Sequence, residues 1–227
     1  MRVGLGTGST AAHMIRGLGS RIRDGLELAG VATSSHASRT LAETEGIHVT
    51  PLEDLGELDL YLDGADEIDP HLDLIKGGGG ALLHEKILAA SSRRFVVIAD
   101  VSKRVGRLGE FGVPIEVITT ARALVLRRLE EQGARATVRM NGSVPVQTDE
   151  GNLLIDAHFG LLDDPATVGR ALKEIPGIVE HGLFIGMTSE ALLAGREGLE
   201  VIRQGDEPPR HDATRGPRGK GRAKPTD

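Results

Sequence analysis

Residues 63 to 86 concentrate groups that could carry out acid–base chemistry. Two short segments hold most of them, Asp63-Gly64-Ala65-Asp66-Glu67 and Lys76-Gly77-Gly78-Gly79-Gly80, and Glu85 follows on an expected helix. Consecutive glycines cost backbone entropy unless another group must approach the chain closely. Carboxylates at the end of an apolar run, beside a glycine loop and a lysine, therefore predict acid–base chemistry on an anionic substrate.

Each of these groups also has an ordinary structural interpretation. One of the acids can cap the turn that follows the apolar run, as Asp commonly does. Lys76 can be a solvated surface lysine, the usual place for that residue type. Glu85 lies roughly 200° around its helix from Leu83, given 3.6 residues per turn. It therefore faces either solvent or a cleft, and the residues alone leave both possibilities open.

A second glycine-rich turn lies near the start of the chain, in the segment 4–10, Gly-Leu-Gly-Thr-Gly-Ser-Thr. Between a strand and a helix, such a turn lets the backbone close on an anion, which the free N–H groups of the helix then bind. A dinucleotide fingerprint would need a glycine where Ser9 stands, and a Walker loop would need a Gly-Lys-Ser/Thr ending. The turn therefore indicates a simple anion site, with an ordinary capped turn as the alternative.

Together these segments closely resemble the type A family of ribose-5-phosphate isomerases. The matching blocks follow the family order from Val3 to about Ile202, and several blocks in order are far more specific than any one alone. Further blocks are Thr33-Ser34-Ser35, Glu85-Lys86 and Ala99-Asp100-Val101-Ser102-Lys103. The resemblance implies an aldose–ketose isomerase that interconverts ribose 5-phosphate and ribulose 5-phosphate through an enediolate, in the non-oxidative pentose phosphate pathway.

The resemblance also implies roles for individual residues. Glu85 would carry the proton between C2 and C1, and Asp63 would assist ring opening. Lys76 and Asp66, with the N–H groups of the glycine loop, would stabilise the enediolate charge. The residues expected to bind the phosphosugar are Gly6, Thr7, Gly8, Ser9, Thr10, Thr33, Ser34, Ser35, Gly77, Gly78, Gly79 and Lys103.

The composition narrows the class of protein further. The 227 residues include no cysteine, and the eight histidines form no helical metal-binding pair. Aromatic residues make up 2% of the chain and the net charge is -6, which argue against a nucleic-acid surface. No apolar run could span a membrane, and no signal segment is visible. We expect a cytoplasmic enzyme of a small phosphosugar, without metal, cofactor, nucleic acid or membrane.

Strands and helices alternate through the first half of the chain, which predicts an α/β fold with a parallel Rossmann-like sheet. Residues 47–49 are expected to form one of its short strands. After Pro114 the expected order becomes βαββαβ, the ferredoxin-like pattern, whose last strand should cover 178–185.

These patterns predict the domain organisation. Residues 1–114 and 186–204 are expected to form the α/β catalytic domain, and residues 115–185 a smaller ferredoxin-like α+β domain. Residues 205–227 are poor in apolar side chains and rich in Pro, Gly, Arg and Lys, which predicts a disordered basic tail.

Two other classes of protein share part of the pattern. A phosphosugar-sensing regulatory module of related fold would keep the glycine turn but has no need for Glu85 beside Lys76. A transferase of acyl-CoA thioesters would want its catalytic glutamate in a different strand–turn context and a longer chain.

The resemblance also bears on assembly and on the start of the chain. The family, together with sheet edges that need cover, predicts a homo-oligomer, either a dimer or a tetramer. Family members usually carry a helix before the first strand, whereas Met1 stands almost directly before Gly4. We expect either an upstream start or a shortened first strand.

Overall fold

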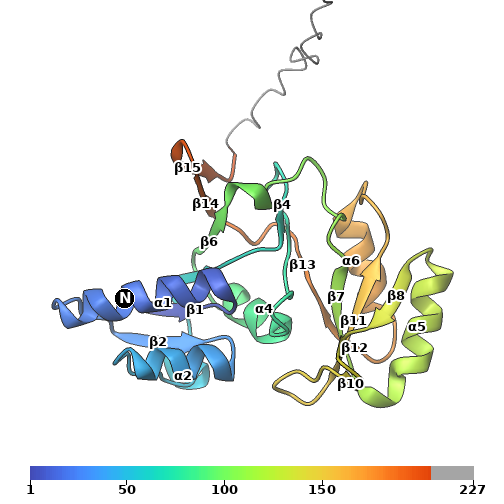
Figure 1. Cartoon of the computed structure of the whole chain (residues 1–227), viewed down its shortest axis with the longest axis horizontal. Coiled ribbons are helices and arrows are strands. Elements are labelled where there is room, and N and C mark those ends of the chain that lie inside the picture. The colour runs from blue at the N-terminus through green and yellow to red at the C-terminus, as the bar shows by residue number, and fades with distance from the viewer. Residues whose placement is uncertain (206–227) are drawn as a thin grey trace, which may run out of the picture.

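The computed structural model describes residues 1–205, whose largest sheet has six strands (Figure 1). These strands are β1 (Arg2–Leu5), β2 (Gly30–Thr33), β3 (Leu60–Asp63), β6 (Phe95–Asp100), β14 (Glu190–Gly195) and β15 (Gly198–Arg203). Their order across the sheet is β15-β14-β6-β3-β1-β2. All neighbours are parallel except β14 and β15, which form an antiparallel hairpin at one edge.

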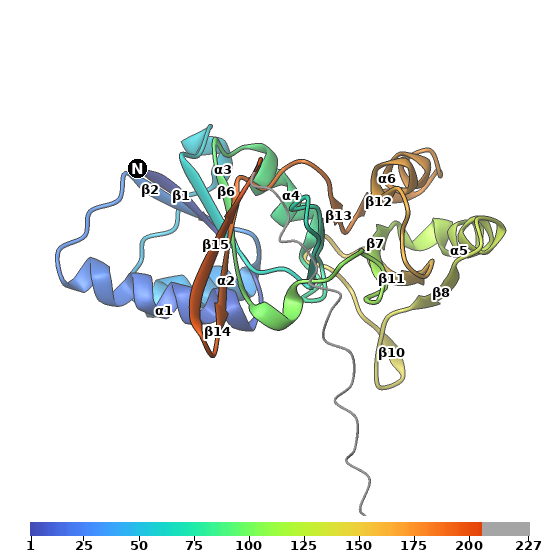
Figure 2. The same ribbon diagram turned by 90° about the horizontal axis from the view of Figure 1, so that it is seen from above.

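Helices cover both faces of this sheet (Figure 2). On one face lie α1 (Ser9–Arg23) and α2 (His36–Thr44), and on the other lie α3 (Leu52–Leu55) and α4 (Leu82–Ala90). Strand side chains alternate between the two cores. Leu5 packs in the cluster that contains Ile15 of α1, whereas Tyr61 packs in the cluster that contains Leu88 of α4. Asp63, two residues after Tyr61, therefore points to the α4 side.

A second, antiparallel sheet has the order β12-β7-β11-β8. Its strands and helices follow one another as β7 (Val113–Val117), α5 (Arg122–Glu131), β8 (Arg135–Val138), β11 (Leu153–His158), α6 (Pro165–Lys173) and β12 (Ile178–His181). This is a βαββαβ unit with its own buried core of aliphatic side chains. The predicted fold class, a parallel α/β sheet with a smaller ferredoxin-like unit, is confirmed.

A small three-stranded sheet lies between the two larger ones and was not predicted (Figure 1). It consists of β4 (Glu67–Ile68), β5 (Leu74–Ile75) and β13 (Leu183–Phe184). β5 leads directly into Lys76 and the glycine loop, so this sheet sets the position of both. The remaining elements are a hairpin of β9 (Met140–Asn141) and β10 (Val144–Pro145) and two 3-10 turns, η1 (Val101–Lys103) and η2 (Thr119–Ala121).

Two strand predictions were wrong in detail. Residues 47–49 form no strand, because Ile47 N–H returns to the carbonyl of Ala42 and only Thr50 N–H reaches β2, at Val31. The strand expected over 178–185 is divided at Gly182 between two sheets. A Cβ on Gly182 would lie 2.1 Å from the carbonyl oxygen of Lys76, so only glycine allows this close crossing.

Within residues 1–205, no helix is both long and apolar enough to cross a membrane. The predicted basic tail, 205–227, falls outside the described residues from position 206 onward.

Candidate active site

Asp63, the last residue of β3, is buried and forms the floor of the site. Its Oδ2 accepts a hydrogen bond from the Tyr61 hydroxyl at 2.5 Å, and its Oδ1 accepts the N–H groups of Thr7 at 3.1 Å and Gly64 at 2.7 Å. The glycine turn presses directly against this carboxylate, because a Cβ on Gly6 would lie 1.9 Å from Asp63 Cγ. Asp63 thus ties the first turn to the end of β3.

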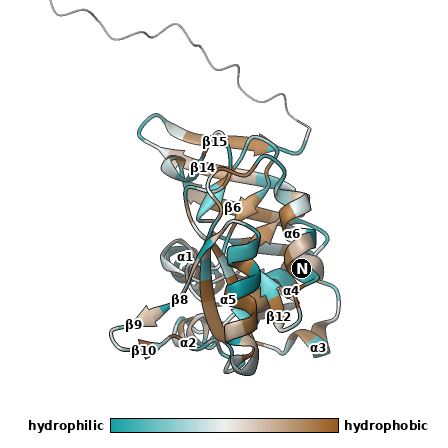
Figure 3. Ribbon diagram, turned by 90° about the vertical axis from the view of Figure 1, so that its right-hand side faces the viewer, coloured by the Kyte–Doolittle hydropathy of each residue, from teal (hydrophilic) through white to brown (hydrophobic). Residues whose placement is uncertain are grey.

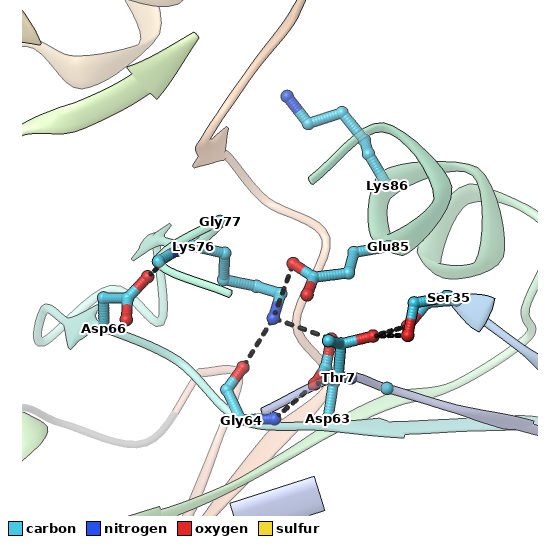
Figure 4. Close-up of polar contacts among 12 residues, drawn as sticks. Thr7, Ser35, Asp63, Gly64, Asp66, Lys76, Gly77, Glu85 and Lys86 are labelled. Carbon is cyan, nitrogen blue, oxygen red and sulfur yellow. Dashed lines mark hydrogen bonds and ion pairs between the residues drawn. The ribbon is translucent and has the colours of Figure 1, made fainter. Parts of the chain in front are cut away.

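Lys76 lies above Asp63 and connects it to Glu85 (Figure 4). Its Nζ is 2.7 Å from Asp63 Oδ2 and 3.2 Å from Glu85 Oε2, and it donates to the Gly64 carbonyl at 2.7 Å. Burial acts to lower the pKa of Lys76, but the charges of Asp63 and Glu85 outweigh it and raise the pKa above its ordinary value. Lys76 is therefore a buried, charged ammonium group of the site and not a solvated surface lysine.

Glu85 comes from the first turn of α4 and points toward Lys76 rather than into solvent (Figure 4). It is only 2% exposed, and its Oε2 accepts no hydrogen bond within residues 1–205. Burial raises its pKa to about 8, against the opposing effect of Lys76 and with a further increase from Asp63. A carboxyl group in this state can take up or release a proton near neutral pH. The neighbouring Lys86 points away from this cluster (Figure 4).

The glycine loop is held by Asp66. Asp66 Oδ2 accepts the N–H of Gly78 at 2.8 Å, and a Cβ on Gly78 would lie 2.6 Å from the other carboxylate oxygen. Gly77 has a φ of 101° and Gly80 a φ of 87°, which favour glycine at both positions. Three of the four glycines thus have structural reasons: two left-handed residues and one close approach.

A pocket of about 260 Å³ opens over these groups. Its wall combines the first turn, the end of β3, the glycine loop, α4 and η1. The residues that line it are Thr7, Gly8, Ser9, Thr10, Gly64, Ala65, Asp66, Lys76, Gly77, Gly78, Gly79, Glu85 and Lys103. Segments far apart in the sequence therefore meet at the carboxyl ends of parallel strands, where α/β sheets bind ligands.

Some of the predicted catalytic and binding residues lie outside the pocket wall. Gly6, Asp63 and the segment Thr33-Ser34-Ser35 are absent from the lining. Thr7 Oγ1 lies 2.7 Å from the Ser34 hydroxyl and 2.8 Å from the Ser35 hydroxyl. Ser35 also caps α2 by accepting the N–H of Ser38 at 3.1 Å. These serines position Thr7 in this structure.

Two residues that support the site were not singled out from the sequence: Tyr61 and Ser38. Tyr61 and Asp63 stand two apart on one strand, so period-two alternation could have placed both on one face. Ser38 donates its hydroxyl to the Gly6 carbonyl at 2.7 Å, a contact between distant segments that no local pattern reveals. Within the described part of the chain, no group of three or more His, Asp or Glu side chains could hold a metal ion.

The fold and this site define an α/β enzyme with buried acid–base groups beneath a polar pocket. Comparison with known proteins places it more closely. Residues 29–198 match the family model of ribose 5-phosphate isomerase A, also called phosphoriboisomerase A. The ribose-5-phosphate isomerase A of Roseiflexus castenholzii is 53% identical over 203 residues, which cover 88% of this chain and 86% of that protein. The enzyme of Nitrobacter hamburgensis is 50% identical and 90% of each chain is covered.

Solved structures agree with the sequence comparisons. Ribose 5-phosphate isomerase A from Methanocaldococcus jannaschii superposes with a TM-score of 0.85 at 40% identity, over 89% of this chain and 91% of that one. A D-ribose-5-phosphate isomerase in complex with phospho-erythronic acid superposes with a TM-score of 0.87 at 37% identity, over 89% and 90%. The chain therefore belongs to the ribose 5-phosphate isomerase A family and is an isomerase. The regulatory alternative has no support.

Proposed function

We propose that this chain interconverts D-ribose 5-phosphate and D-ribulose 5-phosphate through an enediolate, in the non-oxidative pentose phosphate pathway. The observation that carries the proposal is the environment of Glu85 in the pocket wall. Glu85 is a buried carboxylate whose Oε2 has no hydrogen bond within the described residues 1–205, it lines the pocket, and its pKa is raised to about 8. An aldose–ketose isomerase needs such a base to move a proton between neighbouring carbons.

Glu85 removes the proton from C2 of the open-chain aldose and returns it to C1, while a proton moves between the two oxygens. The negative charge that develops on oxygen in the enediolate lies near the Lys76 ammonium, which is held in its charged form. Asp66 supports the same region through its hydrogen bond to Gly78. The assignment of ring opening to Asp63 stays a prediction, and its geometry favours a further part in holding Lys76.

The phosphate group fits the other wall of the pocket. There the turn over Thr7, Gly8, Ser9 and Thr10 begins helix α1, whose first N–H groups are free for an anion. Lys103 lines the same pocket and supplies a positive charge. Thr33, Ser34 and Ser35 take part through Thr7 in this proposal.

The direct test mixes the purified protein with ribose 5-phosphate in the presence of EDTA and measures the ketose formed. Formation of ribulose 5-phosphate under chelation is expected, because the proposed chemistry uses only side chains and backbone N–H groups of the protein. Absence of ketose, or activity that returns only with a divalent ion, would refute the mechanism.

We also propose that the chain is a cytoplasmic homo-oligomer, either a dimer or a tetramer. Support comes from the edge strand β15, where Leu199 is 65% and Val201 37% exposed and part of the ribbon is brown in Figure 3. Exposed apolar edges are commonly covered by another chain. Light scattering at micromolar concentration tests this, and a monomer would contradict it.

A further inference from the structure

Arg139, which lies between β8 and β9, extends from the antiparallel unit to the glycine loop of the active site. Its side chain is largely buried, at 17% exposure, and pairs with Asp156 of β11. Arg139 Nε is 2.9 Å from Asp156 Oδ2, and Nη2 donates to the other carboxylate oxygen. Such a two-point pair fixes the plane of the guanidinium group.

The remaining nitrogen of Arg139 holds the glycine loop by its carbonyl groups. Nη1 donates to the carbonyl oxygens of Gly77 at 3.0 Å and Gly78 at 3.1 Å. The N–H of Gly78 donates in turn to Asp66. The peptide unit between Gly77 and Gly78 is therefore held at both ends, by Arg139 and by Asp66.

This arrangement also fixes the orientation of the next peptide unit, between Gly78 and Gly79. Its peptide bond is trans, so the Gly78 carbonyl and the Gly79 N–H point in opposite directions. Because the carbonyl points to Arg139, the Gly79 N–H points away from Arg139. Gly79 lines the pocket together with Lys76 and Glu85. Within residues 1–205, no protein acceptor receives this N–H.

We propose that Arg139 is a positioning residue for the isomerisation: by fixing the Gly78 carbonyl, it directs the Gly79 N–H into the pocket as a donor for the enediolate oxygen. The inference rests on the proposed function for its chemistry. A donor fixed before the reaction stabilises developing charge without reorganisation. Through this contact, the Arg139–Asp156 ion pair of the antiparallel unit holds the glycine loop of the active site.

Two ligands separate this role from general structural support. Phospho-erythronic acid, seen bound to a related isomerase, carries a planar carboxylate that resembles the enediolate. Ribitol 5-phosphate carries the same phosphate on a chain with no planar carbon. For Arg139→Gln, we expect the affinity for phospho-erythronic acid to fall about tenfold or more and kcat to fall by about 10–10². Affinity for ribitol 5-phosphate and KM should change less than about twofold.

The control is Arg94→Gln, which removes another arginine–carboxylate contact, 2.9 Å between Arg94 and Glu190, that does not touch the loop. It should leave both affinities and kcat unchanged. If Arg139→Gln does not fold, Arg139→Lys replaces it, because lysine keeps a cation beside Asp156. This variant should likewise lose affinity for phospho-erythronic acid and keep its affinity for ribitol 5-phosphate. Equal weakening of both ligands, or unchanged affinity and kcat in a folded variant, would overturn the proposal.

The binding comparison requires no turnover. It therefore decides on Arg139 separately from the reaction, whose own failure would be seen as an absence of ketose with the unaltered protein.

Discussion

Glu85 and Lys76 form an ion pair with 3.2 Å between Glu85 Oε2 and Lys76 Nζ, and within residues 1–205 no well-aligned hydrogen bond reaches that oxygen. The Lys76 ammonium instead lies closer to Asp63 and to the Gly64 carbonyl, both at 2.7 Å. The effect of burial on Glu85 therefore exceeds the effect of Lys76, and its pKa rises to about 8. The lysine keeps its charge while the glutamate exchanges a proton near neutral pH.

The pH dependence of kcat/KM follows from this pKa. A base must be ionised to accept the proton, so kcat/KM should rise about tenfold per pH unit up to about pH 8 and level off above it. Initial rates in a series of buffers from about pH 6 to 9 measure the profile. A rate that stays constant down to pH 6 would mean that another group is the base.

Glu85→Gln should lower kcat by about 10²–10⁴ and leave phosphosugar binding largely intact, because the amide keeps the shape but cannot accept the proton. Near-normal turnover in this variant would remove Glu85 from the mechanism. Affinity for ribitol 5-phosphate, measured by calorimetry, serves as the control for a correctly formed pocket.

The same variant should change how stability depends on pH. The pKa of Glu85 is raised from its ordinary value of 4.5 to about 8 in the folded chain, so the folded state holds this proton more tightly than the unfolded state. Its contribution to stability is complete below about pH 4.5 and is lost as the pH rises to about 8. Glutamine does not titrate, so the Tm of the variant should exceed that of the natural chain by a margin that grows across this range. A constant difference would contradict the assigned pKa.

The sequence predicted the parts of the site that are close together in the chain. Asp66 and Lys76 line the pocket and Asp63 contacts Lys76, because a strand end and a glycine loop place them there. The direction of Glu85 could not be settled by helical period, which allows solvent or a cleft; the packing of α4 against the six-stranded sheet decides it.

Contacts between distant segments could not be read from local patterns. Arg139 reaches the glycine loop although it lies 62 residues after Gly77 in the chain. Ser34 and Ser35 carry hydroxyl groups that could bind a ligand, yet in the structure both hydroxyls are hydrogen-bonded to Thr7. Composition and spacing indicate which side chains could bind a ligand. Tertiary packing decides which of them already form hydrogen bonds within the protein.

Tyr61→Phe tests the support beneath Asp63. The change removes the 2.5 Å hydrogen bond to Asp63 while the ring keeps its packing against Phe95, at 4.8 Å between centroids. A hydrogen bond to a charged group contributes about 1.5–3 kcal/mol, so the free energy of unfolding in urea should fall by about that amount. Thr44→Val, which removes an exposed helix hydrogen bond, should change it far less. Equal stability of the tyrosine variant and the natural chain would show that the other donors to Asp63 suffice.

Lys103→Ala tests whether the exposed lysine at the pocket wall binds the phosphate. Lys103 ends η1, lines the pocket and makes no salt bridge within residues 1–205. A charge-assisted hydrogen bond contributes about 1.5–3 kcal/mol, so KM should rise at least about tenfold. Because the phosphate is bound equally in the ground state and the transition state, kcat should change little. Exposed charges are screened by salt, so the increase in KM should shrink as ionic strength rises.

Lys173→Ala is the matched control, since Lys173, the last residue of α6, pairs with Glu180 of β12 and lies outside the pocket wall. It should leave KM and its salt dependence unchanged. A loss of kcat at constant KM in Lys103→Ala would assign this lysine to the chemical step instead. An unchanged KM with unchanged kcat would place phosphate binding on the N–H groups of the turn before α1 alone, because that turn provides the other donors at this end of the pocket.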